Sequence, residues 1–98
     1  MPFMVKVLHM KKAITLKISG RVQNVGFRFH TRKKAQELGI SGFVKNELDG
    51  TVYAEAEGEE EPLDKFILWC RQGPSWARVD HVNIQTSPVQ GYDGFVVK

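Results

Sequence analysis

The spacing of hydrophobic residues divides the chain into successive predicted elements. Residues 13–19 alternate between apolar and polar side chains, which is the two-residue period of a strand with one buried face. From residue 27 onward, apolar positions recur at helical spacing instead. The predicted buried stripe of this helix is Phe27, Thr31, Ala35 and Leu38, and its predicted solvent face is Arg32, Lys33, Gln36 and Glu37. We expect Gly39 to end the helix as a left-handed cap, with Ile40 as the apolar contact that follows it.

A turn signal, Leu48-Asp49-Gly50, separates the next two strand patterns and predicts an antiparallel hairpin. A second helical pattern follows, with Pro62 expected at its first position and Gly73-Pro74 at its end. Its predicted buried stripe is Leu63, Phe66, Ile67 and Cys70. The last two predicted strands cover residues 79–84 and 94–98.

The predicted order is therefore βαββαβ with a short additional C-terminal strand. One antiparallel sheet with both helices on one face is the economical arrangement, because the apolar faces of sheet and helices then bury each other. The pattern predicts the α+β class and a ferredoxin-like sandwich.

The composition is typical of one soluble globular domain. The 98 residues are 42% hydrophobic and 26% charged, with a net charge of +3, and a chain of this length has room for one modest core. No apolar run is long enough to span a membrane, and the first ten residues lack the apolar core and cleavage site of a signal peptide. We expect one domain over residues 10–98, preceded by an extension of unknown role, residues 1–9.

The cysteine and histidine residues indicate neither a disulfide nor a metal site. Cys70 is the only cysteine, which excludes an internal disulfide and fits a reducing cytosol. Its place on the apolar side of a predicted helix favours a buried, unreactive thiol. His9, His30 and His81 do not have the spacing of metal ligands. We predict a cytoplasmic protein without metal or cofactor.

The stretch that joins the first strand to the first helix is GRVQNVGFR, Gly20 to Arg28. A helix N-terminus carries unpaired N–H groups and partial positive charge, so it binds anions. Arg28 in the first helical turn adds a fork of donors that matches phosphoryl oxygens. The stretch predicts a small phosphate-binding cradle. It is not a nucleotide-binding Walker loop, because no GK[ST] follows it.

Two motifs together resemble the acylphosphatase family. Its signatures are a GxVQGVxFR loop and a G-aromatic-V-K-N hairpin, and both occur here in order, the second as GFVKNELDGTVYAEAEG from Gly42 to Gly58. The similarity extends from about Lys12 to the C-terminus. The resemblance implies hydrolysis of carboxyl-phosphate mixed anhydrides to a carboxylate and inorganic phosphate. Acetyl phosphate, carbamoyl phosphate and the acyl phosphate of glycolysis are the substrate class it implies.

The resemblance also implies roles for individual residues. Arg28 is expected to bind the phosphoryl group and Asn46 to position the attacking water. An amide is too weak a base to deprotonate water but can orient it, and an acyl phosphate expels a stable carboxylate, so no general acid is required. The implied cradle is the main chain of Gln23, Asn24, Val25, Gly26, Phe27 and Arg28.

Asn24 departs from the family pattern, which usually has glycine at this position. Glycine there permits a positive backbone angle, and asparagine is the non-glycine residue that best tolerates the left-handed region. We therefore expect the loop to keep its shape at a small cost. Glu47, directly after Asn46, is expected on the solvated surface of the hairpin.

Two other functions stay open from the sequence. One is a non-catalytic domain that binds phosphate or carbamoyl groups, because related domains occur inside larger carbamoyl-transfer proteins. The other is an RNA-binding module, which needs exposed aromatic residues on adjacent strands. Only Tyr53 and Phe43 qualify, and Glu55 and Glu57 would repel phosphates on the same face. We expect a monomer that acts on a small-molecule acyl phosphate, with neither nucleic acid nor membrane as a partner.

Overall fold

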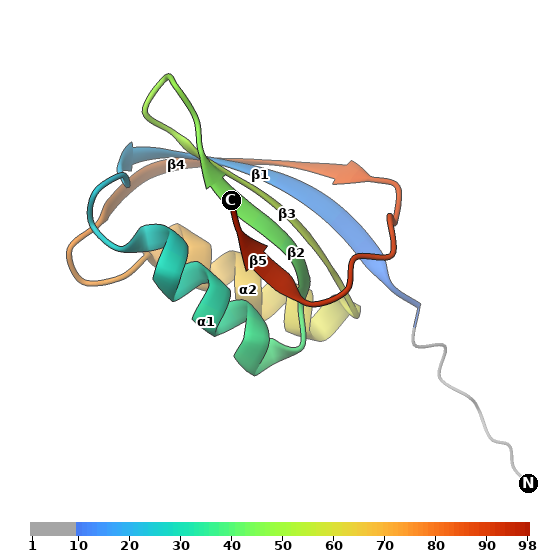
Figure 1. Cartoon of the computed structure of the whole chain (residues 1–98). Helices are drawn as coiled ribbons and strands as arrows, with labels where there is room; N and C mark the ends of the chain where they lie inside the picture. Colours follow the sequence, from blue (N-terminus) through green and yellow to red (C-terminus); the bar gives the residue numbers. More distant parts are fainter. Residues whose placement is uncertain (1–9) are drawn as a thin grey trace, which may run out of the picture.

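Five strands form one sheet, and both helices cover the same face of it (Figure 1). The computed structural model describes residues 10–98, so the predicted extension at residues 1–9 lies outside the described residues. The elements in chain order are β1 (Lys12–Arg21), α1 (Phe27–Leu38), β2 (Ser41–Asn46), β3 (Val52–Gly58), α2 (Glu60–Gln72), β4 (Arg78–Ser87) and β5 (Phe95–Val97). This order confirms the predicted ferredoxin-like α+β fold.

The sheet is mixed, in the strand order β4-β1-β3-β2-β5. The four longer strands pair with one another in antiparallel orientation, as predicted. The short β5 instead pairs with β2 in parallel, with Val44 opposite Val97. The expected antiparallel arrangement therefore does not extend to this edge. β4 ends at the end of the sheet where β2 begins, so the chain crosses that end and enters β5 in the same direction as β2.

The core lies between the sheet and the helices. The inward-facing side chains of β1 and β3 are almost completely buried, and α1 and α2 place Phe27 and Phe66 against them. Cys70 is buried in the same core, and that burial raises the pKa of its thiol far above the usual range. The predicted stripes of both helices are therefore confirmed, with Leu38 and Ile67 only partly buried at their edges.

The C-terminal end of α1 lies where it was predicted, whereas α2 begins earlier than predicted. Gly39 caps α1 in the left-handed region, with φ of 71°, and the Ile40 N–H donates a 2.8 Å hydrogen bond to the Ala35 carbonyl. The second helix begins earlier than predicted, at Glu60, so Pro62 is its third residue. This is tolerated because the first N–H groups of a helix have no helical partner, and the acidic residues before Pro62 favour the helix N-terminus.

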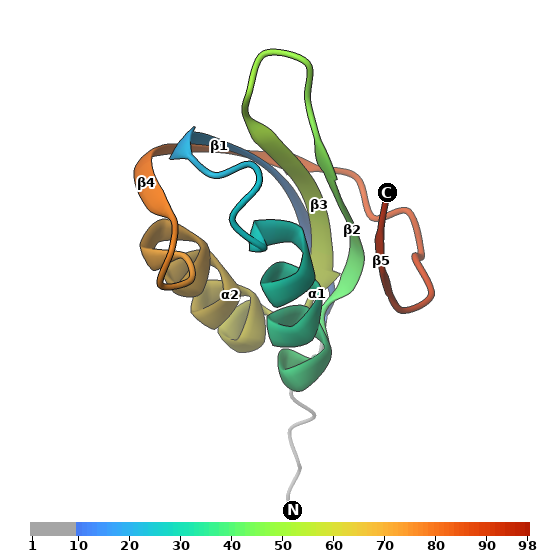
Figure 2. The same cartoon turned by 60° about the vertical axis from the view of Figure 1, so that its left-hand side comes forward.

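The parallel pairing of β2 and β5 brings four chain segments to one end of the molecule. The C-terminal ends of these two strands lie together, and the Lys98 N–H donates a 2.8 Å hydrogen bond to the Val44 carbonyl. The loop that follows β1 and the N-terminus of α1 lie at the same end, beside the β2–β3 hairpin (Figure 2). Within residues 10–98 no helix has the length and apolar character to cross a membrane.

Candidate active site

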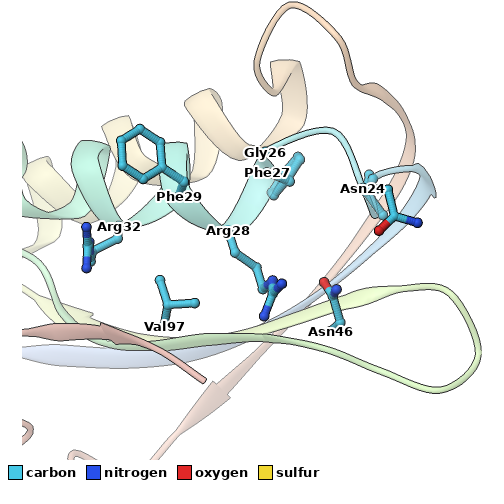
Figure 3. Close-up of a pocket in the computed structure, with 9 residues that line it drawn as sticks. Asn24, Gly26, Phe27, Arg28, Phe29, Arg32, Asn46 and Val97 are labelled. Carbon is cyan, nitrogen blue, oxygen red and sulfur yellow. The ribbon is translucent and has the colours of Figure 1, made fainter.

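A pocket of about 330 Å³ opens where these four segments meet (Figure 3). It lies between the N-terminal turn of α1 and the ends of β2 and β5. Its lining residues are Val22, Asn24, Gly26, Phe27, Arg28, Phe29, Arg32, Asn46 and Val97. The pocket therefore joins the two motifs of the sequence, since Arg28 comes from the loop motif and Asn46 from the hairpin motif.

The loop before α1 turns sharply through two left-handed residues. Asn24 has φ of 63° and is the non-glycine residue with positive φ among residues 10–98, while Gly26 has φ of 77° at the N-cap. The first helical hydrogen bond runs from the His30 N–H to the Gly26 carbonyl, at 3.1 Å. The preceding N–H groups of the first turn have no partner within the helix, and no acidic residue lies in that turn. The turn therefore presents unpaired donors and partial positive charge to the pocket.

The Arg28 side chain crosses from the helix to the sheet edge. Its Nη1 donates a 2.9 Å hydrogen bond to the main-chain oxygen of Lys98, just beyond β5. Figure 3 shows its guanidinium between Asn46 and Val97. The bond to Lys98 fixes the side chain over the pocket, and the other guanidinium N–H groups have no acceptor among residues 10–98. Such a fixed fork of donors can bind an anion through more than one hydrogen bond.

The Asn46 side chain carries the one buried polar atom that is unpartnered in the described part of the chain. Its Oδ1 is buried and accepts no hydrogen bond. Asn46 is the last residue of β2, and its backbone pairs with Val52, which faces the helices. The side chain is therefore directed into the pocket, as Figure 3 shows. A buried acceptor without a partner costs free energy, which a donor entering the pocket would recover.

Gln23 holds the loop against the hairpin. Its Nε2 donates to the main-chain carbonyls of Glu47 at 2.8 Å and Thr51 at 2.9 Å. These carbonyls stand on either side of the β2–β3 turn, so one side chain links the loop to the strand end that carries Asn46. Gln23 therefore fixes the position of Asn46 relative to Arg28.

The pocket includes some predicted site residues and adds others. Asn24, Gly26, Phe27, Arg28 and Asn46 line it, whereas Gln23 and Val25 do not. The sequence analysis did not identify the remaining lining residues, Val22, Phe29, Arg32 and Val97. Arg32 could have been found from its position one helical turn after Arg28. Val97 could not, because its place depends on the parallel pairing of β5.

Glu47 and His30, which the sequence places close to Asn46 and Arg28, do not line the pocket. Glu47 forms an ion pair with Lys45 at 3.6 Å and is absent from the pocket lining, in line with the expected surface position. His30 is exposed and contacts the Phe29 ring edge-on. No group of three or more His, Cys, Asp or Glu side chains within residues 10–98 is arranged to hold a metal ion.

The open face of the sheet does not favour RNA binding. Phe43 is only 7% exposed, and the rings of Tyr53 and Tyr92 pack against it. The Tyr53 hydroxyl donates a 2.7 Å hydrogen bond to Glu55 Oε2, which places an anion among these aromatic residues. Among residues 10–98, this face therefore has no freely exposed aromatic pair of the kind that stacks bases.

Comparison with known proteins supports one family. The family model described as Acylphosphatase matches residues 14–97. A curated relative from Archaeoglobus fulgidus named acylphosphatase is 47% identical over 85 residues, which cover 87% of this chain and 96% of the relative.

Solved structures give the same result. An acylphosphatase from Coxiella burnetii superposes with a TM-score of 0.87 at 39% identity, covering 90% of this chain and 93% of that one. A structure of full-length HypF in a phosphate- and nucleotide-bound form matches with a TM-score of 0.84 at 28% identity, and the match covers 94% of this chain but 12% of HypF. The same fold thus also occurs as a small part of a larger protein.

Proposed function

This chain belongs to the acylphosphatase family, and on that premise we propose that Arg28 and Asn46 carry out the hydrolysis of acyl phosphates in the pocket between α1 and β2. The observation that carries the proposal is the buried, unpartnered Oδ1 of Asn46, which faces the same pocket as the Arg28 guanidinium. One side chain offers an acceptor for a water molecule, and the other offers donors for a phosphoryl group.

The proposed binding mode uses the loop and Arg28 together. The unpaired N–H groups of the first turn of α1 and the free donors of Arg28 surround the phosphoryl oxygens. Negative charge spreads over these oxygens in the transition state for phosphoryl transfer, so donors fixed in advance contribute most of the catalysis. The bond from Arg28 to Lys98 and the bonds from Gln23 to the hairpin provide that fixed arrangement.

The proposed reaction is direct attack of water on phosphorus. The water oxygen forms a bond to phosphorus while the bond from phosphorus to the acyl oxygen breaks, and the bonding electron pair leaves with the carboxylate. The water proton is released to solvent, and the products are a carboxylate and inorganic phosphate. Asn46 orients the water through its carbonyl oxygen and does not act as a base.

We further propose that the enzyme is monomeric, cytoplasmic and independent of metal ions, and that its substrates are small acyl phosphates. The carboxylate leaving group is stable at neutral pH, so the reaction as written calls for neither a general acid nor a metal. The lone cysteine suits a reducing compartment.

The test is hydrolysis of benzoyl phosphate in the presence of EDTA, with inorganic phosphate as a competitive inhibitor. We expect turnover by the wild type. Arg28→Ala should raise both KM and the inhibition constant for phosphate, and lower kcat by about 100-fold, because one fixed donor set is lost. Arg71→Ala is the matched control, since Arg71 lies in the last turn of α2 and is exposed.

One outcome would reject the proposed catalysis, and another would reject only its independence of metal ions. Folded wild type that binds phosphate but does not turn over benzoyl phosphate would indicate the non-catalytic phosphate-binding domain. Turnover that EDTA abolishes and a divalent metal restores would reject metal independence alone.

A further inference from the structure

Arg32 lines the pocket without a role in the proposed phosphoryl transfer. It lies one helical turn after Arg28 and is partly buried, although the sequence pattern predicted it in solvent. Figure 3 shows Arg32 and Asn46 on opposite sides of Arg28. Arg32 is therefore at the end of the pocket away from the water-positioning residue, on the side where an acyl group can extend.

The charge of Arg32 has no carboxylate partner among residues 10–98. Its contact is the Phe29 ring, whose centroid lies 5.8 Å from Arg32 Cζ. The ion pairs of the described residues use other side chains. Like charges four residues apart destabilise a helix, and no acid in the first turn of α1 offsets Arg28 and Arg32. An anion bound beside both arginines would relieve this repulsion.

Two apolar side chains complete this end of the pocket. Phe29 is 54% exposed and Val97 is 38% exposed, and both line the pocket. Val97 comes from β5, so it approaches from the sheet side, whereas Phe29 belongs to α1. Apolar walls with a single charge beyond them suit a short hydrocarbon chain that ends in a polar group.

We propose that Phe29, Val97 and Arg32 bind the acyl part of the substrate, and that Arg32 selects acyl phosphates whose acyl group carries a second negative charge. This inference rests on the proposed function, since the phosphoryl group has to occupy the cradle at Arg28. The Cα atoms of the two arginines are separated by about 6 Å along the helix axis. Their long side chains can therefore reach a phosphoryl group and a carboxylate at the two ends of a short acyl chain.

The experiment compares succinyl phosphate with butyryl phosphate, which has a methyl group in place of the terminal carboxylate. The measured quantity is the ratio of their kcat/KM values. The wild type should prefer succinyl phosphate. Arg32→Gln should lower the ratio about fivefold, as expected for one partly exposed charged hydrogen bond of about 1 kcal/mol. Lys33→Gln, which removes the same charge from the exposed neighbouring position, is the control and should leave the ratio unchanged.

A binding measurement tests the inference without turnover. The probes are 3-phosphonopropionate and propylphosphonate, which differ in the same way and are not hydrolysed. The carboxylate should strengthen binding to the wild type, and Arg32→Gln should remove that gain. The inference is overturned if the wild type and Arg32→Gln show the same ratio of kcat/KM values for the two substrates and the same ratio of affinities for the two phosphonates. Loss of turnover with both substrates but retained discrimination between the phosphonates would reject the proposed function while supporting the role of Arg32.

Discussion

Single residues define the shape of the cradle, and Asn24 is the most informative of them. Its left-handed conformation, with φ of 63°, is the one expected from the residue type, because asparagine tolerates this region better than other non-glycine residues. This feature could be expected from the sequence because the resembled family has glycine at this position, and asparagine is the residue that best replaces glycine in the left-handed region. The place of Arg32 beside Arg28 follows from helical spacing, but its partial burial in the pocket does not, because helical periodicity does not tell which polar side chains the rest of the fold will cover.

Asn24→Ala should weaken phosphate binding and lower the free energy of unfolding by about 1 kcal/mol, because alanine is disfavoured in the left-handed region. Asn24→Gly should retain phosphate binding, since glycine adopts this conformation without steric cost. Phosphate inhibition constants and urea unfolding of the two variants provide the check. An alanine variant equal to the wild type in both measurements would show that the loop does not need this conformation.

Among the elements, the β2–β3 hairpin holds Asn46 at a fixed distance from α1. Its two strands approach each other closely at Gly42. Gly42 in β2 has φ of 142°, and a Cβ atom there would lie 1.9 Å from the Glu55 carbonyl oxygen. The Gly42 N–H also donates a 2.9 Å hydrogen bond to the Gly94 carbonyl, which ties β2 to the segment before β5. A side chain at Gly42 would therefore separate strands that together position the pocket.

Gly42→Ala should lower the free energy of unfolding by at least about 2 kcal/mol more than Gly50→Ala does, because the new methyl group collides with backbone. Gly50 lies in the hairpin turn with φ of 92°, and a Cβ atom there would meet no other atom within 4 Å, so its substitution brings backbone strain alone. Urea denaturation of both variants measures the difference. Equal losses would mean that the strands can move apart freely.

The segment after β4 is held to β3 by hydrogen bonds to two carboxylates of β3. Glu57 is almost fully buried and accepts hydrogen bonds from the N–H groups of Gln90, Gly91 and Tyr92. Glu55 accepts from the hydroxyls of Tyr53 and Tyr92. These bonds guide the chain from β4 to β5 and thus to the Lys98 oxygen that holds Arg28.

Because of Tyr53 and Tyr92, we expect the free energy of unfolding to fall at alkaline pH. The bond to Glu55 raises the pKa of Tyr92 to about 12, and burial together with Glu55 raises the pKa of Tyr53 to about 12, both from 10.0. The folded state holds the hydroxyl protons of both tyrosines more tightly than the unfolded chain does. The hydroxyl groups therefore stabilise the fold fully below pH 10, and this stabilisation is lost as the pH rises toward 12. Tyr92→Phe should therefore show a shallower fall of the unfolding free energy across this window than the wild type. Parallel curves would exclude the Tyr92–Glu55 bond as the cause.

For the domain as a whole, the hydrophobic periodicity and the turn signals predicted both helices and the four longer strands, in their order along the chain. The exception was β5, a three-residue strand whose pairing depends on the path of the preceding connection and not on its own sequence. This one pairing places Val97 and the Lys98 oxygen at the pocket. The sequence predicted that Arg28 and Asn46 share a site, and both line the pocket, but it did not predict the pairing of the strand that completes their surroundings.

A chain that begins at Met10 should fold and turn over acyl phosphates like the full chain. The physical reason is that the sheet, both helices and the pocket all lie within residues 10–98, and β1 begins at Lys12. Thermal unfolding and benzoyl phosphate hydrolysis of the two chains provide the comparison. A truncated chain with lower stability or activity would show that residues 1–9 contribute to the domain.

The most direct measurement of the central claim is the effect of Asn46→Ala on kcat and on the inhibition constant for phosphate, with benzoyl phosphate as substrate. If Asn46 orients the attacking water, kcat should fall by about 100-fold while phosphate inhibition stays within about twofold of the wild type, because misplacing a reactant is costly and binding is left to Arg28 and the loop. Circular dichroism and urea unfolding confirm that the variant is folded. An unchanged kcat, or a loss that appears only as weaker phosphate binding, would contradict the account.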